Sequence, residues 1–122
     1  MTRQLWLESL PFYDDLVAVM GEYDESKDYV GAEGDWKSRF IPRTIWGIDV
    51  NMAAYIHDYW YNKGGGNQQR FQADCMFLVD MMRLIEMSGS WRITRFMARN
   101  RAVKYFGAVR ENGKASFTYR VN

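Results

Sequence analysis

The chain is poor in the residues that build metal centres and disulfides. Among its 122 residues it has one cysteine, Cys75, and one histidine, His57. A single cysteine excludes an internal disulfide framework and suits a reducing compartment, or a particle assembled inside one. One cysteine and one histidine also fall short of the four ligands of a structural zinc site.

Long apolar runs are missing as well. No stretch approaches the roughly 18 residues needed to span a bilayer. Near the N-terminus the acids Glu8, Asp14 and Asp15 interrupt the apolar residues, so no signal peptide is expected. The predicted location is therefore the cytoplasm or a virion. Hydrophobic residues make up 48% of the chain, which predicts a single packed domain over residues 1–122.

The charge is nearly balanced but unevenly placed. Residues 1–50 carry ten acids and five bases, whereas residues 51–122 carry five acids and eleven bases. The segment 91–105 is basic and has no acid, and aromatic residues flank its charges. Such a segment suits an anionic membrane surface or nucleic-acid phosphates, and a solvated basic face is the simpler interpretation. We do not expect nucleic acid as the partner.

Three helices are predicted in the second half of the chain. The first begins near Asp49 or Asn51, either of which can cap it, and stops at the glycines 64–66. The second runs over 68–87 and the third over 91–105. Asn112-Gly113, with alternating residues on both sides, predicts a β-hairpin in the tail. The predicted fold class is therefore mainly α (α+β).

The first third of the chain is harder to interpret. Leu5, Leu7 and Leu10 are spaced as in a strand, whereas Phe12 to Met20 have helical spacing. Residues 21–38 are expected to form a loop. Phe40 and Ile41 are expected to be extended because Pro42 follows them.

One aspartate lies on the apolar stripe of the predicted helix 68–87. Asp74 shares that stripe with Phe71 and Leu78, and also with Met81, Met82 and Ile85. A buried carboxylate needs a donor. The short 64–67 connection makes the two helices antiparallel neighbours, so we predict a direct hydrogen bond from His57 to Asp74. Such a bond would fix the imidazole tautomer and leave the other nitrogen to take a proton from water.

Two further residues of the first helix belong to this constellation. Tyr61 follows His57 by four residues, so its hydroxyl is expected to reach the histidine or Asp74. Asp58 lies about 100° round the helix from His57, and its oxygens are suited to a hard cation.

The segment His57-Asp58-Tyr59-Trp60-Tyr61 resembles the His-Asp-x-x-Tyr helix of the phospholipase A2 superfamily. The similarity is greater to its disulfide-free viral capsid type, in which an Ala-Ala-x-x-His-Asp-x-x-Tyr helix precedes an Ala-Asp-x-x-Phe/Leu helix. Ala53–Tyr61 and Ala73–Phe77 match these two helices. Together with Ile41-Pro42-Arg43, they also resemble small uncharacterised proteins of tailed phages. The resemblance covers residues 38–82.

The resemblance implies a phospholipase A2-like core and a role for each matching residue. His57 would be the base that activates water, Asp74 would orient it, and Tyr61 would bond to Asp74. Asp58 would bind calcium together with backbone carbonyls of a preceding loop. Trp46 and Gly47 stand at the place of that loop, with one glycine where the family has two.

Two functions follow from these observations. One is a calcium-dependent phospholipid ester hydrolase of phage or prophage origin, acting at a membrane surface. The other is a non-catalytic phage protein that keeps the fold and its polar core and binds other phage proteins. The His-Asp pair with Asp74 favours the first, and the single glycine of the loop favours the second.

Overall fold

A computed structural model describes residues 1–30 and 42–120 of the chain. As predicted, it is mainly helical with a small antiparallel sheet. In chain order its elements are α1 (Arg3–Glu8), α2 (Tyr13–Met20), β1 (Thr44–Ile45), β2 (Ile48–Asp49), α4 (Asn51–Lys63), α5 (Asn67–Met87), α6 (Arg92–Asn112) and the 3₁₀ turn η1 (Gly113–Ser116). The expectations for Phe40 and Ile41 lie outside the described residues. No described helix is both long and apolar enough to span a membrane.

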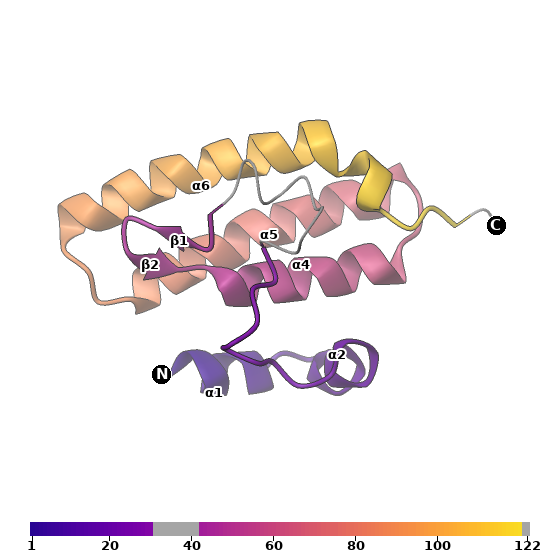
Figure 1. Ribbon diagram of the computed structural model, residues 1–122, viewed down its shortest axis with the longest axis horizontal. Coiled ribbons are helices and arrows are strands. Elements are labelled where there is room, and N and C mark those ends of the chain that lie inside the picture. The colour runs from indigo at the N-terminus through magenta and orange to yellow at the C-terminus, as the bar shows by residue number, and fades with distance from the viewer. Residues whose placement is uncertain (31–41, 121–122) are drawn as a thin grey trace.

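The long helices α4, α5 and α6 lie side by side, with α5 in the middle (Figure 1). The connections between them are short, so each helix runs antiparallel to the next. Gly64 ends α4 at φ 70°, a backbone conformation that favours glycine. Next to it, Gln69 accepts a hydrogen bond from the backbone N–H of Gly66 at 2.9 Å, which fixes the start of α5.

Residues 3–20 form the two short helices α1 and α2 on the far side of α4 (Figure 1). The strand-like spacing of Leu5 and Leu7 was misleading, because both lie in α1, whose start is capped by the Thr2 hydroxyl. The carboxylate of Asp15 joins α2 to α4. It accepts hydrogen bonds from the Tyr59 hydroxyl at 2.5 Å and the Lys63 ammonium at 2.9 Å.

Asn51 anchors the segment before α4 rather than capping the helix with its side chain. Its Oδ1 accepts from the Tyr29 N–H, and its Nδ2 donates to the Lys27 carbonyl and the Tyr23 hydroxyl. Asp49 is the residue that serves the helix start, since it accepts the Asn51 N–H at 2.8 Å. The buried amide of Asn51 is therefore fully used in holding residues 23–29 against α4.

The hairpin occurs at residues 44–49 and not at Asn112-Gly113. β1 pairs antiparallel with β2, and the turn between them is Trp46-Gly47, with φ 51° and 79°. Positive φ at both central residues is the geometry that matches strand twist in a two-residue hairpin. Asn112 and Gly113 have negative φ, −113° and −80°, so they continue from α6 into η1. The predicted tail hairpin is therefore wrong.

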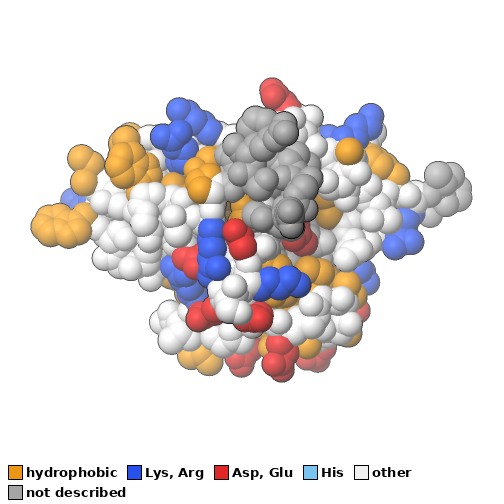
Figure 2. Space-filling view, viewed as in Figure 1, with side chains coloured by type: hydrophobic (Ala, Val, Ile, Leu, Met, Phe, Trp, Pro, Cys, Tyr) orange, Lys and Arg blue, Asp and Glu red, His pale blue; other side chains and the backbone are white. Residues whose placement is uncertain are grey.

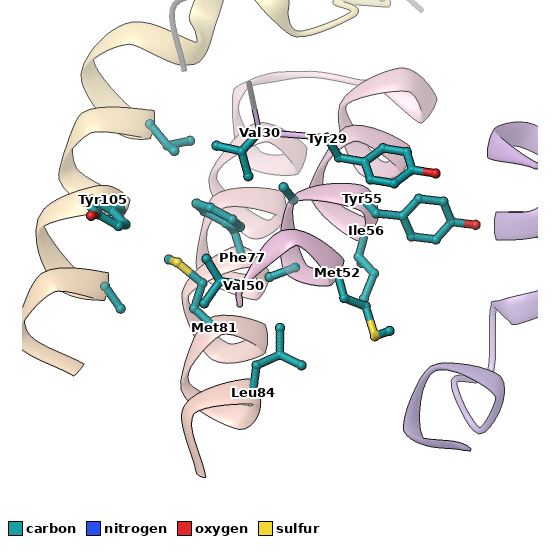
Figure 3. Packing of buried hydrophobic residues seen from close by; sticks show 14 of the residues in the cluster. Tyr29, Val30, Val50, Met52, Tyr55, Ile56, Phe77, Met81, Leu84 and Tyr105 are labelled. Atoms are coloured by element: carbon teal, nitrogen blue, oxygen red, sulfur yellow. The ribbon is translucent and has the colours of Figure 1, made fainter. Parts of the chain in front are cut away.

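The apolar core lies between the long helices and beneath the segment that precedes α4. Figure 3 shows Phe77 and Met81 of α5 in the space between α5 and α6, close to Val30 and Val50. Tyr29 and Tyr55 point together towards the side of α1 and α2, with ring centroids 5.0 Å apart. The side chains that α6 buries against α5 are mostly small, with Ala98 and Ala102 fully covered. Small residues let α5 and α6 approach closely.

Candidate active site

The predicted hydrogen bond between His57 and Asp74 is present. Nε2 of His57 on α4 lies 2.9 Å from Oδ1 of Asp74 on α5. The Tyr61 hydroxyl, one turn along α4, donates to the same oxygen at 2.6 Å. The antiparallel packing of α4 and α5 thus brings together the three residues that sequence reasoning named as catalytic.

Aromatic rings enclose the imidazole. Its centroid is 4.1 Å from that of Tyr61 and 4.7 Å from that of Phe77. His57 is 1% exposed and Asp74 is 0% exposed. The pair is therefore held in a dry environment, where hydrogen bonds and charges interact more strongly than in water.

Two arginines bind the other side of the Asp74 carboxylate. Arg110 of α6 donates to Oδ2 at 2.6 Å, and Arg70, one turn before Asp74 on α5, lies 3.6 Å from the same oxygen. Arg70 also donates to the backbone carbonyl of Arg110 at 3.4 Å. Side chains from all three long helices therefore meet at this single carboxylate.

The balance of these contacts keeps Asp74 ionised. Burial acts to raise the pKa of Asp74, but the hydrogen bonds from His57, Tyr61 and Arg110 outweigh burial and bring it below its ordinary value. An ionised carboxylate only accepts, so Nε2 of His57 carries a proton, and whenever the ring is neutral Nδ1 is its basic nitrogen. Burial, together with the hydrogen bond to Asp74, raises the pKa of Tyr61, which stays a donor.

Sequence reasoning missed both arginines. Arg70 was detectable, because it precedes Asp74 by four residues on the same helix. Arg110 was assigned to the strand of a tail hairpin, whereas it lies on the last turns of α6. Phe71 was expected in the buried stripe but is 43% exposed, and its ring lies beneath the Arg110 guanidinium at 5.1 Å. The buried side of α5 keeps Asp74, Met81 and Ile85 of the predicted stripe and adds Ala73, Phe77 and Leu84.

Gly113 fixes the position of the Tyr61 hydroxyl. A Cβ at Gly113 would lie 2.5 Å from that oxygen, although its backbone conformation suits any residue. We expect Gly113→Ala to displace the hydroxyl from Asp74 and to destabilise the fold by about 1–3 kcal/mol, the usual cost of overpacking. Urea unfolding measures this. Gly107→Ala is the matched control, because nothing lies near its Cβ and it should be neutral or stabilising. Equal stabilities of the two variants would contradict this role of Gly113.

The three residues proposed to hold calcium lie on two elements, α4 and the turn between β1 and β2. Asp58 is half-buried on α4, seven residues and about 10 Å along the axis from Asn51. Trp46 and Gly47 form the hairpin turn, which lies beyond the start of α4, towards the end where α5 meets α6 (Figure 1). A calcium site there would need the carbonyls of the turn and the Asp58 carboxylate within about 2.6 Å of one ion, and this role of the three residues stays a prediction. Within the described residues no group of three His, Cys, Asp or Glu side chains is placed to hold a metal.

A groove of about 660 Å³ opens beside α4 and α5, close to the site in sequence. Its walls include the side chains of Trp60, Phe71 and Met76, and Lys63 lies at its edge. In the sequence Trp60 precedes Tyr61, and Ala73 precedes Asp74. The side chains of His57, Tyr61 and Asp74 do not line the groove. It is a mostly apolar surface of the size that binds small ligands.

Comparison with family models, with curated proteins and with solved structures finds no match. The assignment of a function therefore depends on the geometry of the site and on the motif that carries it.

Proposed function

We propose that this protein is a phospholipase A2-type hydrolase of phage or prophage origin that cleaves phospholipid esters. The observation that supports the proposal is the His57–Asp74 hydrogen bond, made from helix positions that match the His-Asp-x-x-Tyr and Ala-Asp-x-x-Phe patterns. The Tyr61 hydroxyl on the same carboxylate is the third element of that pattern.

The reaction uses the two imidazole nitrogens for different tasks. Nδ1 of His57 takes a proton from water while the water oxygen forms a bond to the ester carbonyl carbon. The imidazolium that forms is stabilised by the Asp74 carboxylate at Nε2. When the carbon–oxygen bond to the alcohol breaks, the proton returns from Nδ1 to the leaving oxygen, which releases a fatty acid and a lysophospholipid. The apolar groove beside Trp60 offers a surface for the acyl chain.

Calcium takes no part in the steps above. In the family that the motif resembles, the ion polarises the ester carbonyl, and here Asp58 would be its carboxylate ligand. The proposed steps use only the side chains of this protein and contain no metal. A role for calcium is instead one arm of the test.

An assay of fatty-acid release from phospholipid vesicles tests the proposal. We expect release by the wild-type protein and at least a hundredfold less by His57→Gln, because general-base catalysis is typically worth about 10²–10⁴ in rate. Asp14→Asn, on the exposed face of α2, is the matched control and should keep full activity. Retention of the wild-type rate by His57→Gln would exclude His57 as the base.

The same assay in millimolar calcium and in a chelator decides the role of the ion. A calcium requirement that Asp58→Asn weakens would place the ion at Asp58. Activity that is equal in both conditions would show that the reaction does not need it.

A second function has its own support. Asp74 is bound by Arg110 and Arg70 as well as by His57 and Tyr61, so the cluster links α4, α5 and α6 in the manner of a structural polar core. This favours a non-catalytic phage protein that keeps the cluster for its fold and binds other phage proteins. The absence of release from both zwitterionic and anionic vesicles would favour this function over hydrolysis.

A further inference from the structure

Helix α6 has a second apolar stripe that faces away from the protein. Its inner stripe is buried against α5 and consists of Ala98, Ala102, Tyr105 and Val109. On the opposite side the side chains of Ile93, Phe96 and Val103 are exposed by 72%, 55% and 52%. Trp91, directly before the helix, is 84% exposed. An apolar group of this kind on an otherwise polar surface marks an interaction site.

Basic residues border this outer stripe, and the single acid of α6, Glu111, lies about two turns beyond Val103. Residues 92–110 contain six bases and no aspartate or glutamate. Arg95 and Arg99 pair with Glu86 of α5. For Arg92, Arg101 and Lys104, the described part of the chain provides no ion-pair partner. The outer face of α6 therefore combines apolar side chains with uncompensated positive charge.

The opposite side of the protein carries the negative charge. Figure 2 shows acidic side chains gathered over α1 and α2, with basic side chains along α6 and apolar ones at the end where α5 meets α6. A negatively charged surface would attract the α6 side and repel the α1–α2 side. The charge distribution would thus attract the protein to such a surface and turn its α6 side towards it.

We propose that the outer face of α6 binds the surface of an anionic phospholipid bilayer. Trp91, Ile93 and Phe96 enter the boundary between headgroups and acyl chains, while Arg92 and Lys104 contact lipid phosphates. This is the arrangement of an interfacial amphipathic helix, apolar on one side and basic at its borders. Two copies of the chain meeting about a twofold axis on this face would bring their arginines together, which disfavours self-association. Nucleic-acid phosphates would leave the exposed apolar stripe uncovered.

Sedimentation with vesicles tests the proposal. We expect the protein to bind vesicles that contain a quarter phosphatidylglycerol, to bind pure phosphatidylcholine far more weakly, and to be released as salt rises from 50 to 500 mM. Arg92→Gln/Lys104→Gln should lower the partition coefficient about tenfold or more, since each basic residue near an anionic surface adds to the attraction. The charge control is Arg83→Gln/Lys114→Gln, whose two sites lie on other elements.

The apolar stripe has its own pair of variants. Ile93→Ser/Phe96→Ser should lose most binding, whereas Leu5→Ser/Val79→Ser should keep it, although the second pair is 58% and 50% exposed. Circular dichroism checks that each variant is folded. Equal vesicle binding by Ile93→Ser/Phe96→Ser and Leu5→Ser/Val79→Ser would overturn the proposal. So would a lipid-free dimer that Ile93→Ser/Phe96→Ser dissociates, or binding to duplex DNA that depends on Arg92 and Lys104 alone.

Binding and hydrolysis are measured separately. The inference requires no catalysis, and the vesicle experiment is run with His57→Gln beside the wild type in the presence of chelator. If both proteins bind, and only the wild type releases fatty acid in a parallel assay with calcium, both proposals hold. If the protein hydrolyses dispersed ester but binds no anionic vesicle, the membrane face is excluded and the hydrolase is not.

Discussion

Asp74→Asn is expected to lower the free energy of unfolding at pH 7 by about 3–5 kcal/mol, the cost of removing one partner from a buried ion pair. The amide keeps the shape of the side chain but loses the charge that faces Arg110 and Arg70. Of those two, Arg70 is itself buried and cannot turn to water. Of the contacts to Oδ2, the one with Arg110 is the shorter, at 2.6 Å. Urea unfolding followed by tryptophan fluorescence measures the change.

The pH dependence of this effect identifies its cause. The pKa of Asp74 is lowered in the folded protein, so its contribution to stability is complete above the unfolded pKa of about 3.9 and is lost as pH falls through the folded value. The wild type and Asp74→Asn should therefore differ most at pH 7 and converge below pH 4. Asp14→Asn removes an exposed carboxylate and should follow the wild type at every pH. A difference that stays the same at pH 3 and pH 7 would contradict an ionised Asp74.

The central helix pair and its polar contact were predictable from the sequence. The glycines 64–66 allow only a short connection, which makes α4 and α5 antiparallel neighbours. An aspartate beside a run of apolar residues must then find a donor across that interface. His57 was the predicted donor, because it lies on the matching face of α4. The observed distance of 2.9 Å confirms the contact, whereas the catalytic roles of His57 and Tyr61 stay predictions.

The error at the C-terminal end came from a local signal that tertiary packing overrides. Asn112-Gly113 has the composition of a hairpin turn, but the inner stripe of α6 keeps its helical spacing from Ala98 to Val109. Burial of that stripe against α5 carries the helix through Asn112. Arg110 thereby reaches Asp74. A tail predicted to form a strand would not have placed Arg110 at this carboxylate.

The true hairpin had little local signal. It is only two residues long on each side, and its turn places Trp46 at φ 51°. Positive φ is uncommon for a large non-glycine residue and is found where the surrounding structure imposes it. Single-sequence patterns contain no record of such a constraint. The calcium loop was assigned from its place before the helix, and its role stays a prediction.

Asp80 is a second buried carboxylate of α5, and its pKa is shifted in the opposite direction from that of Asp74. It is 4% exposed and lies between Phe77 and Leu84 on the buried side of the helix. Within the described residues no hydrogen bond or ion pair reaches its carboxylate. Burial raises the pKa of Asp80 to about 7, and the charge of Arg83 only partly opposes this. The folded protein therefore favours the protonated, neutral form.

We expect Asp80→Asn to stabilise the protein at pH 8 by as much as about 4 kcal/mol, since a rise of roughly three pKa units at 1.36 kcal/mol each sets the upper limit. A raised folded pKa means that stability is intact below the unfolded pKa of about 3.9 and is lost as pH rises through about 7. The stability of the wild type should thus decline between pH 4 and pH 7, and that of Asp80→Asn should not. Urea unfolding from pH 4 to pH 8 measures both, with Asp14→Asn as the control. Destabilisation by Asp80→Asn at pH 8 would show that the carboxylate is ionised and paired in the folded protein. The two aspartates of α5 would then act alike, whereas we expect opposite slopes: Asp74 adds stability as pH rises towards 4, and Asp80 removes stability as pH rises from 4 to 7.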